Sequence, residues 1–139
     1  MLNVPFDLYG TDWGRYRNYR GFAQNKIDCL KHYKFCFCYE NQKNINGYIT
    51  EKIFNCFQAG CVPIYWGAKN IEFFVPKNCF IAREDFLNQE QLYDFITKMN
   101  RQEYEEYLNN IRKYLECDCR AKLFSIDNFV KIVSDAIFN

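Results

Sequence analysis

The sequence predicts an α/β layered domain in which helices flank a parallel sheet, with a helical tail at the C-terminal end. Two apolar runs, at residues 34–39 and 61–66, show no alternation of polar and apolar side chains. Such runs are typical of strands that are covered on both faces. Residues 50–60, between them, carry apolar side chains at helical spacing. A strand, a loop, a helix and a second strand in this order favour a parallel sheet.

The first third of the chain predicts short elements. Residues 4–9 are expected to form a strand that ends at Gly10, and residues 11–21 a polar and aromatic loop. Ile27 and Leu30 lie three apart, which predicts a short helix over residues 24–32. After the strand at 34–39, polar residues and a glycine indicate a loop over 40–47.

The central helix has a start signal and a stop signal. Thr50 is a residue type that caps helix N-termini, and Gly60 stands where a left-handed C-terminal residue is favoured. The apolar residues that share one side are Ile49, Ile53, Phe54 and Phe57. In the strand that follows, Pro63 cannot donate a hydrogen bond, so we predict that it lies near an edge or an irregularity of the sheet.

A connection at residues 67–70 and a short strand at 79–82 precede three predicted helices. Asn88, Asn100 and Ser125 are their start signals, and Glu103 makes a capping box with Asn100. Their apolar stripes are predicted to pack against the core: Leu92, Phe95, Ile96 and Met99; Tyr104, Tyr107, Leu108, Ile111 and Leu115; Phe129, Ile132, Val133 and Ala136.

Composition favours one domain over residues 1–139. The chain has 139 residues, of which 49% are hydrophobic and 19% aromatic, enough for one well-filled core. Lys and Arg total 18 against 17 Asp and Glu. With no net field to attract polyanions, nucleic acid is not an expected partner.

The eight cysteines are expected to be reduced and structural. Most lie inside apolar runs, where a thiol behaves as a small hydrophobe; Cys117 and Cys119 are the expected exceptions. There is no Cys-x-x-Cys pair, and His32 is the single histidine, so no metal site is predicted. The N-terminal residues lack the features of a signal peptide, and no apolar run is long enough for a bilayer.

The loop and helix start at residues 40–52 are the predicted ligand site, because open parallel sheets bind ligands beyond the carboxyl ends of their strands. Lys52 in the first helical turn opposes the helix dipole, which is unusual unless an anion such as phosphate binds there. Glu51 either matches the dipole or binds ribose hydroxyls, and Tyr48 either packs against the helix or reaches a phosphate or sugar. The residues alone leave these alternatives open.

Four linked strings resemble the signature of family 10 glycosyltransferases, the α1,3/4-fucosyltransferases, over roughly residues 6–86. They are Tyr33-Lys34-Phe35, Tyr39-Glu40-Asn41, Gly47-Tyr48-Ile49-Thr50-Glu51-Lys52-Ile53 and Ala59-Gly60-Cys61-Val62-Pro63-Ile64-Tyr65-Trp66-Gly67. Phe73-Phe74-Val75-Pro76 and Cys79-Phe80-Ile81 resemble the family's continuation.

The resemblance implies a GT-B enzyme whose C-terminal, Rossmann-like domain binds GDP-fucose and whose N-terminal domain binds a glycan acceptor. It implies that Asn41 and Tyr48 contact the fucosyl-diphosphate end, Glu51 the ribose and Lys52 the diphosphate. Lys52 would also neutralise charge on the departing GDP. The implied chemistry is an inverting transfer that needs no cofactor. Since the chain has no Asp-x-Asp motif, donor binding is expected to need no metal.

The family's general base and its diphosphate-binding arginine lie upstream of the matched segment. The chain is therefore expected to be a truncated donor domain that is inactive alone, and Arg15, Arg17 or Arg20 is a candidate substitute for the arginine. The alternatives are an inactive nucleotide-sugar-binding module and a GT-B enzyme with another donor. A microbial or viral enzyme is expected in the cytoplasm, with peripheral membrane association in glycan or lipopolysaccharide synthesis, and a eukaryotic one in the Golgi lumen.

Overall fold

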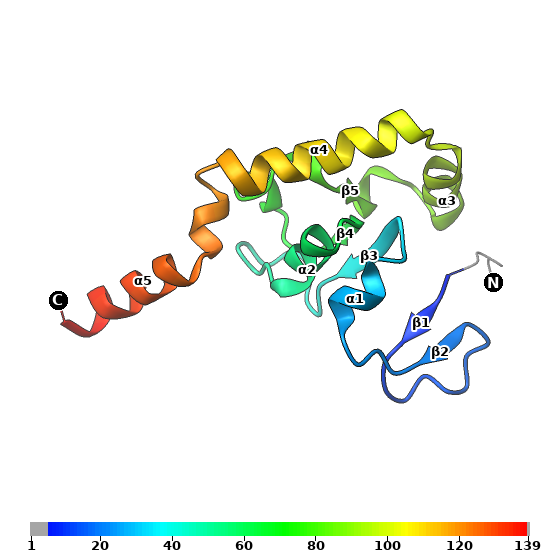
Figure 1. Cartoon of the computed structure of the whole chain (residues 1–139), viewed down its shortest axis with the longest axis horizontal. Coiled ribbons are helices and arrows are strands. Elements are labelled where there is room, and N and C mark those ends of the chain that lie inside the picture. Colours follow the sequence, from blue (N-terminus) through cyan, green and yellow to red (C-terminus); the bar gives the residue numbers. More distant parts are fainter. Residues whose placement is uncertain (1–5, 139) are drawn as a thin grey trace.

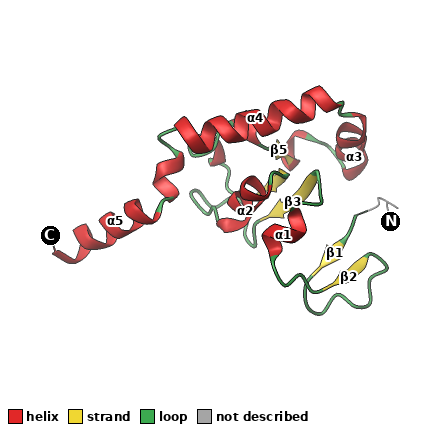
Figure 2. Cartoon of the chain, in the orientation of Figure 1, coloured by secondary structure: helices red, strands yellow, loops and turns green. Residues whose placement is uncertain are grey.

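The computed structural model describes residues 6–138. Helices and short strands alternate through its first two thirds, and helices alone follow (Figure 2). The strands are β1 Leu8–Tyr9, β2 Tyr19–Gly21, β3 Phe35–Tyr39, β4 Val62–Trp66 and β5 Ile81–Ala82. The helices are α1 Lys26–Leu30, α2 Glu51–Ala59, α3 Gln89–Lys98, α4 Arg101–Cys117 and α5 Ile126–Phe138, and short 3-10 turns link several of them.

The central sheet is parallel, as predicted. Its strand order is β3-β4-β5, and β3 pairs with β4 from Phe35 opposite Val62 to Tyr39 opposite Trp66. The strand β5 pairs only with Ile64 and Tyr65 of β4. A second, two-stranded parallel sheet joins β1 to β2, and β2 lies where the sequence predicted only loop.

Helices surround the central sheet. In Figure 1, α4 crosses the molecule on one side of β3 and β4, whereas α1 and α2 lie on the other. The fully buried core side chains come mainly from the sheet, from α2, α3 and α4, and from the turns beside the sheet; they include Ile53, Val62, Ile64, Phe80, Leu92 and Tyr114. This layered arrangement confirms the predicted fold class.

Of the two locations predicted for Pro63, a sheet edge and an irregularity of the sheet, the edge was wrong, since β4 is the central strand. The Val62 amide donates to Lys34 on the β3 side, so the nitrogen of Pro63 faces the β5 side. The β4–β5 ladder begins one residue later, at Ile64. Pro63 is tolerated because no strand hydrogen bond is required at that position.

The start signals of α3 and α4 are confirmed. The Asn88 side chain accepts from the Gln91 amide, and Asn100 and Glu103 form the predicted capping box. The stripe on α4 differs at one position, because Tyr114 is buried while Leu115 is 45% exposed.

The predicted packing of the last stripe was wrong. Helix α5 projects away from the body of the molecule (Figure 1), and its apolar side chains are exposed, with Phe129 at 67% and Ile132 at 58%. Its amphipathic pattern therefore has no matching face among residues 6–138.

The buried thiols behave as predicted. Cys38, Cys56, Cys61 and Cys79 lie in the core, whereas Cys117 and Cys119 are exposed. A hydrogen bond with Cys56, and then burial, raises the pKa of Cys38. That thiol is therefore protonated at neutral pH and unreactive.

Candidate functional site

The loop between β3 and α2 starts at the carboxyl end of β3 and leads into the N-terminus of α2. Tyr39 pairs with Trp66 in the last register position of β3 and β4, so the loops that leave both strands meet at one edge of the sheet. This edge is where open parallel sheets bind ligands.

Glu40 is the organising residue of this edge. Its side chain is 0% exposed and accepts three hydrogen bonds. They come from the Thr50 amide at 2.8 Å, the Thr50 hydroxyl at 2.7 Å and the Lys52 ammonium at 2.9 Å. A buried carboxylate is tolerated only with such compensation.

The expected capping role of Thr50 was wrong. Thr50 occupies the N-cap position, but within the described chain its side chain makes no capping hydrogen bond. Its hydroxyl instead donates to Glu40 and accepts from Lys52 at 3.2 Å. The first-turn amides of α2 therefore keep no side-chain cap, and they face the region beside Lys52 with the positive end of the helix dipole.

The ion pair shifts the pKa of both partners. Burial acts to raise the pKa of Glu40, but the hydrogen bonds from Thr50 and Lys52 outweigh it and hold the pKa below its usual value of 4.5. Burial acts to lower the pKa of Lys52, and the Glu40 carboxylate outweighs it and raises that pKa. Both groups are therefore charged at neutral pH.

These shifts predict an acid-dependent stability. A depressed carboxylate pKa stabilises the fold above the pKa of the unfolded chain, and the contribution is lost as the pH falls through the folded-state pKa. We expect the free energy of unfolding to fall below about pH 4.5 more steeply in the wild type than in Glu40→Gln. Urea titrations across pH 3–7 measure it, with Glu105→Gln as the exposed control. Parallel curves for wild type and Glu40→Gln would contradict the assignment.

Gly67 leaves room for this arrangement. A Cβ at Gly67 would lie 2.5 Å from the Tyr65 hydroxyl and 2.6 Å from Cγ of Glu40. The Tyr65 hydroxyl also accepts from the Ala68 amide at 3.1 Å. The turn after β4 thus packs directly against the buried carboxylate.

The loop after β3 is fastened to the turn after β4. The Asn44 amide donates to the Gly67 carbonyl at 2.9 Å, and the Gly47 amide donates to the Asn70 side chain at 2.8 Å. The Lys43 ammonium lies 4.6 Å from the centre of the Trp66 ring, a cation–π contact. Two residues in left-handed conformation shape the loop, Asn44 at φ 64° and Gly47 at φ 75°.

The predicted site residues are distributed around this loop. Lys52 lies at the centre of the site, half-buried against Glu40. Glu51 is exposed beside Lys52, and its charge raises the pKa of Lys52 further. Tyr48 is half-buried and precedes the helix by two residues. Asn41 is exposed, directly after Glu40. The structure therefore brings Tyr48, Glu51 and Lys52 to one helix start and leaves Asn41 on the rim.

The sequence predicts only a polar loop at Glu40, so Glu40 is a site residue that sequence reasoning missed. The available signal was an acidic residue directly after a buried strand, with a lysine in the first turn of the next helix. Two of the three proposed substitute arginines have other contacts. Arg20 pairs with Asp7 at 2.6 Å, and Arg15 lies over Tyr16.

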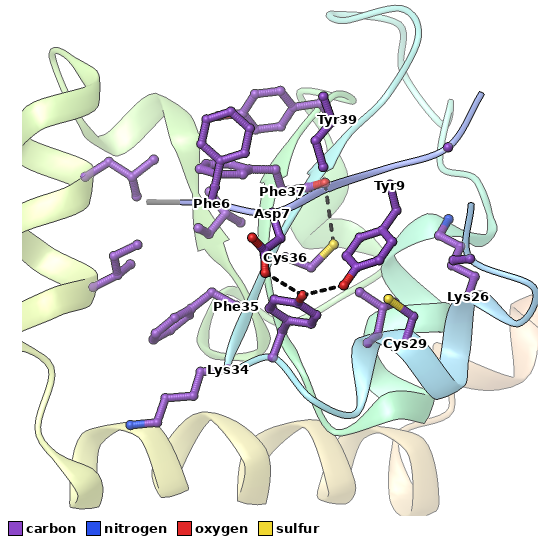
Figure 3. Close-up of a pocket in the computed structure, with 18 of the residues that line it drawn as sticks. Phe6, Asp7, Tyr9, Lys26, Cys29, Lys34, Phe35, Cys36, Phe37 and Tyr39 are labelled. Carbon is purple, nitrogen blue, oxygen red and sulfur yellow. Dashed lines mark hydrogen bonds between the residues drawn. The ribbon is translucent and has the colours of Figure 1, made fainter. Parts of the chain in front are cut away.

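A large groove lies elsewhere, at the outer edge of β3 between β1, α1 and α3 (Figure 3). Its volume is about 1080 Å³, and its walls are mainly aromatic and aliphatic, with Phe6, Phe35 and Phe37 among them. None of Asn41, Tyr48, Glu51 and Lys52 lines it. This groove therefore does not coincide with the polar site.

Three polar side chains at the groove, Asp7, Tyr9 and Tyr33, bind one another (Figure 3). The Tyr33 hydroxyl donates to Asp7 at 2.7 Å and shares a hydrogen bond with Tyr9 at 2.8 Å. Arg20 also binds Asp7, and its hydrogen bond, followed by that of Tyr33, lowers the Asp7 pKa. This closed cluster matches a structural role better than the binding of a charged ligand.

Among residues 6–138, no group of three or more His, Cys, Asp or Glu side chains could hold a metal ion. No helix in that range has both the length and the apolar character needed to cross a membrane.

The fold and the polar edge define a Rossmann-like α/β domain of the kind that forms half of a GT-B glycosyltransferase. Solved structures support this class. A crystal structure of an α1,3-fucosyltransferase superposes with a TM-score of 0.60 and 32% identity, over 68% of this chain and 27% of that chain. A complex of α1,3-fucosyltransferase with GDP-fucose gives a TM-score of 0.59 and 28% identity, over 66% and 30%.

The family model "Glycosyltransferase family 10 (fucosyltransferase) C-term" matches residues 2–129. The chain therefore belongs to glycosyltransferase family 10, the fucosyltransferases, and this confirms the resemblance carried by residues 33–81.

Two fucosyltransferases are about one third identical to this chain over the segments that align. Alpha-(1,3)-fucosyltransferase FucT of Helicobacter pylori is 32% identical over 133 residues, which cover 89% of this chain and 26% of the relative. The mouse 4-galactosyl-N-acetylglucosaminide 3-alpha-L-fucosyltransferase 9 is 32% identical over 111 residues, 77% of this chain and 30% of the relative. The chain thus spans less than a third of the length of these relatives.

Proposed function

We propose that this chain is the donor-binding part of an inverting α1,3-fucosyltransferase, and that it binds GDP-fucose at the β3–α2 edge. The observation that carries the proposal is Lys52, which lies beside helix amides that Thr50 leaves uncapped. A cation next to free helix-N-terminal amides suits a diphosphate. Family membership and the solved GDP-fucose complex of a relative support the choice of donor.

Each site residue has a role in this proposal. Lys52 binds the diphosphate and stabilises the negative charge that grows on the departing GDP. Glu51, exposed in the first turn, accepts hydrogen bonds from the ribose hydroxyls. Tyr48 and Asn41, on the loop rim, contact the fucosyl-diphosphate end. The proposed donor site uses no metal and no cofactor.

The transfer itself requires groups outside this set. In a single displacement, a carboxylate removes the proton of an acceptor hydroxyl, the oxygen attacks the anomeric carbon, and GDP leaves from the opposite face. We assign that base and the glycan-acceptor pocket to the portion that longer relatives have in addition. Residues 1–139 alone are then expected to bind the donor and to transfer no fucose.

Calorimetry with GDP, GDP-fucose and UDP tests the donor assignment. We expect saturable binding of both guanine nucleotides and weaker binding of UDP. Equal binding of UDP would favour a GT-B domain with another donor. An absence of heat with every nucleotide, on protein shown to be folded by circular dichroism, would contradict the proposal.

The ribose contact gives a more specific prediction. Glu51→Ala is expected to weaken GDP binding about tenfold, because a charge-assisted hydrogen bond is lost. The same variant should bind GDP and 2′-deoxy-GDP with similar affinity, whereas the wild type prefers GDP. Glu90→Ala is the matched control, since Glu90 is also an acidic first-turn residue, on α3. A preference for GDP that survives in Glu51→Ala would show that another residue reads the ribose.

A further inference from the structure

A buried carboxylate next to the cation of an anion site is unusual, because it opposes the binding of the anion. Glu40 is inaccessible to solvent, and its Oε2 lies 2.9 Å from the Lys52 ammonium. A glutamine at this position could still accept from the Thr50 amide. The hydrogen bond between the side chain at position 40 and the start of α2 therefore does not require the charge of Glu40.

The fold reserves space for this acid. The Thr50 amide and hydroxyl both donate to it, and the absence of a side chain at Gly67 makes room for its Cγ. Its ionised form is the one that these donors stabilise. Glu40 is thus fixed as a carboxylate, and its remaining partner is Lys52.

We propose that Glu40 balances the charge of Lys52 and so limits how tightly the site holds a diphosphate, which keeps GDP able to leave. This role rests on the proposed function of the same site. In the free site, Lys52 is neutralised by Glu40 and does not repel the positive end of α2. When a diphosphate binds, Lys52 lies between two anions, and Glu40 offsets part of its attraction to the ligand.

Two opposing effects decide the sign of a substitution. Removing a negative charge about 6 Å from a phosphate, at the effective dielectric of a protein surface, is worth up to about a hundredfold in affinity. The same substitution removes the carboxylate that holds the Lys52 side chain in place. Ordering that side chain when the ligand binds costs conformational entropy, which lowers the affinity roughly tenfold. The net expectation is that Glu40→Gln binds the ligand about tenfold more tightly.

The test compares four proteins by calorimetry with inorganic pyrophosphate and with GDP: wild type, Glu40→Gln, Lys52→Met and the double variant. Glu40→Gln should bind both ligands about tenfold more tightly and release GDP more slowly in stopped-flow measurements. In the Lys52→Met background the same change should alter affinity less than twofold, because no cation then holds a phosphate close to residue 40. Glu105→Gln, which removes an exposed carboxylate on α4, is the control and should not change affinity.

Each outcome has a distinct meaning. Unchanged or weaker pyrophosphate binding by Glu40→Gln overturns the charge-balancing role. The role is also overturned if Glu40→Gln raises the affinity as much in the Lys52→Met background as in the wild type. If no protein binds GDP while Glu40→Gln still binds pyrophosphate more tightly, the nucleotide assignment fails and the role of Glu40 stands. The reactivity of Lys52 toward an acylating reagent is a readout independent of any ligand. It should rise in Glu40→Gln, because the Lys52 pKa falls when its carboxylate partner is lost, and unchanged reactivity also overturns the proposal.

Discussion

Replacing Lys52 with methionine is expected to weaken GDP binding by about a hundredfold. Methionine keeps the length of the apolar stem and removes the ammonium that lies beside the uncapped amides of α2. Charge-assisted contacts to phosphate are among the strongest hydrogen bonds in proteins, and about 2.7 kcal/mol corresponds to this loss. Calorimetry with GDP measures the affinity directly.

The Lys52 variant also leaves the Glu40 carboxylate without its cation, which lowers stability. The double variant Glu40→Gln, Lys52→Met separates the two effects, since it removes the unpaired charge and should regain stability without regaining affinity. Lys98→Met is the matched control, because Lys98 is an exposed lysine on α3 that pairs with Asp94. If a folded Lys52→Met protein binds GDP with wild-type affinity, Lys52 does not contribute to the binding site.

The substitution Gly67→Ala is expected to lower the free energy of unfolding by about 3 kcal/mol, at the upper end of overpacking effects. The added Cβ would lie 2.5 Å and 2.9 Å from Oη and Cζ of Tyr65 and 2.6 Å from Cγ of Glu40. Neither side chain can yield easily, since Tyr65 is 3% exposed and Glu40 is held by three hydrogen bonds. Urea denaturation at pH 7 measures the change.

Gly14→Ala is the matched control, because no described heavy atom lies within 4 Å of a Cβ built there. Its effect should stay within about 0.5 kcal/mol. Equal stability of the two alanine variants would show that the turn after β4 can relax. The close packing around Glu40 would then not contribute to the stability of the fold.

Much of the fold was predictable because its signals are local. Unbroken apolar runs marked β3 and β4, and Asn88 and Asn100 marked the starts of α3 and α4. The position of Pro63 was not predictable, because the order of strands and the length of β5 depend on contacts between distant residues. The exposed face of α5 was missed because an amphipathic pattern shows that a helix has an apolar side, not which surface covers it.

Some residues of the candidate site were also predictable from local sequence, and others were not. Lys52 stood out in the sequence because a lysine in a first helical turn opposes the dipole. Glu40 did not, since its role depends on the meeting of residues 40, 50, 52 and 67 in space. Thr50 shows why local rules fail here: a tertiary partner, Glu40, competes with the helix for its hydroxyl.

The hydrogen bonds that join Asn44 to Gly67 and Gly47 to Asn70 affect the thermodynamics of association. A loop that becomes ordered only when a ligand arrives costs conformational entropy at that moment. In this chain the two strand-end connections are already fastened to each other, so that cost is met when the chain folds. The affinity of this edge of the sheet for its ligand is then determined by charge and contact, because ordering the loops on binding costs little conformational entropy.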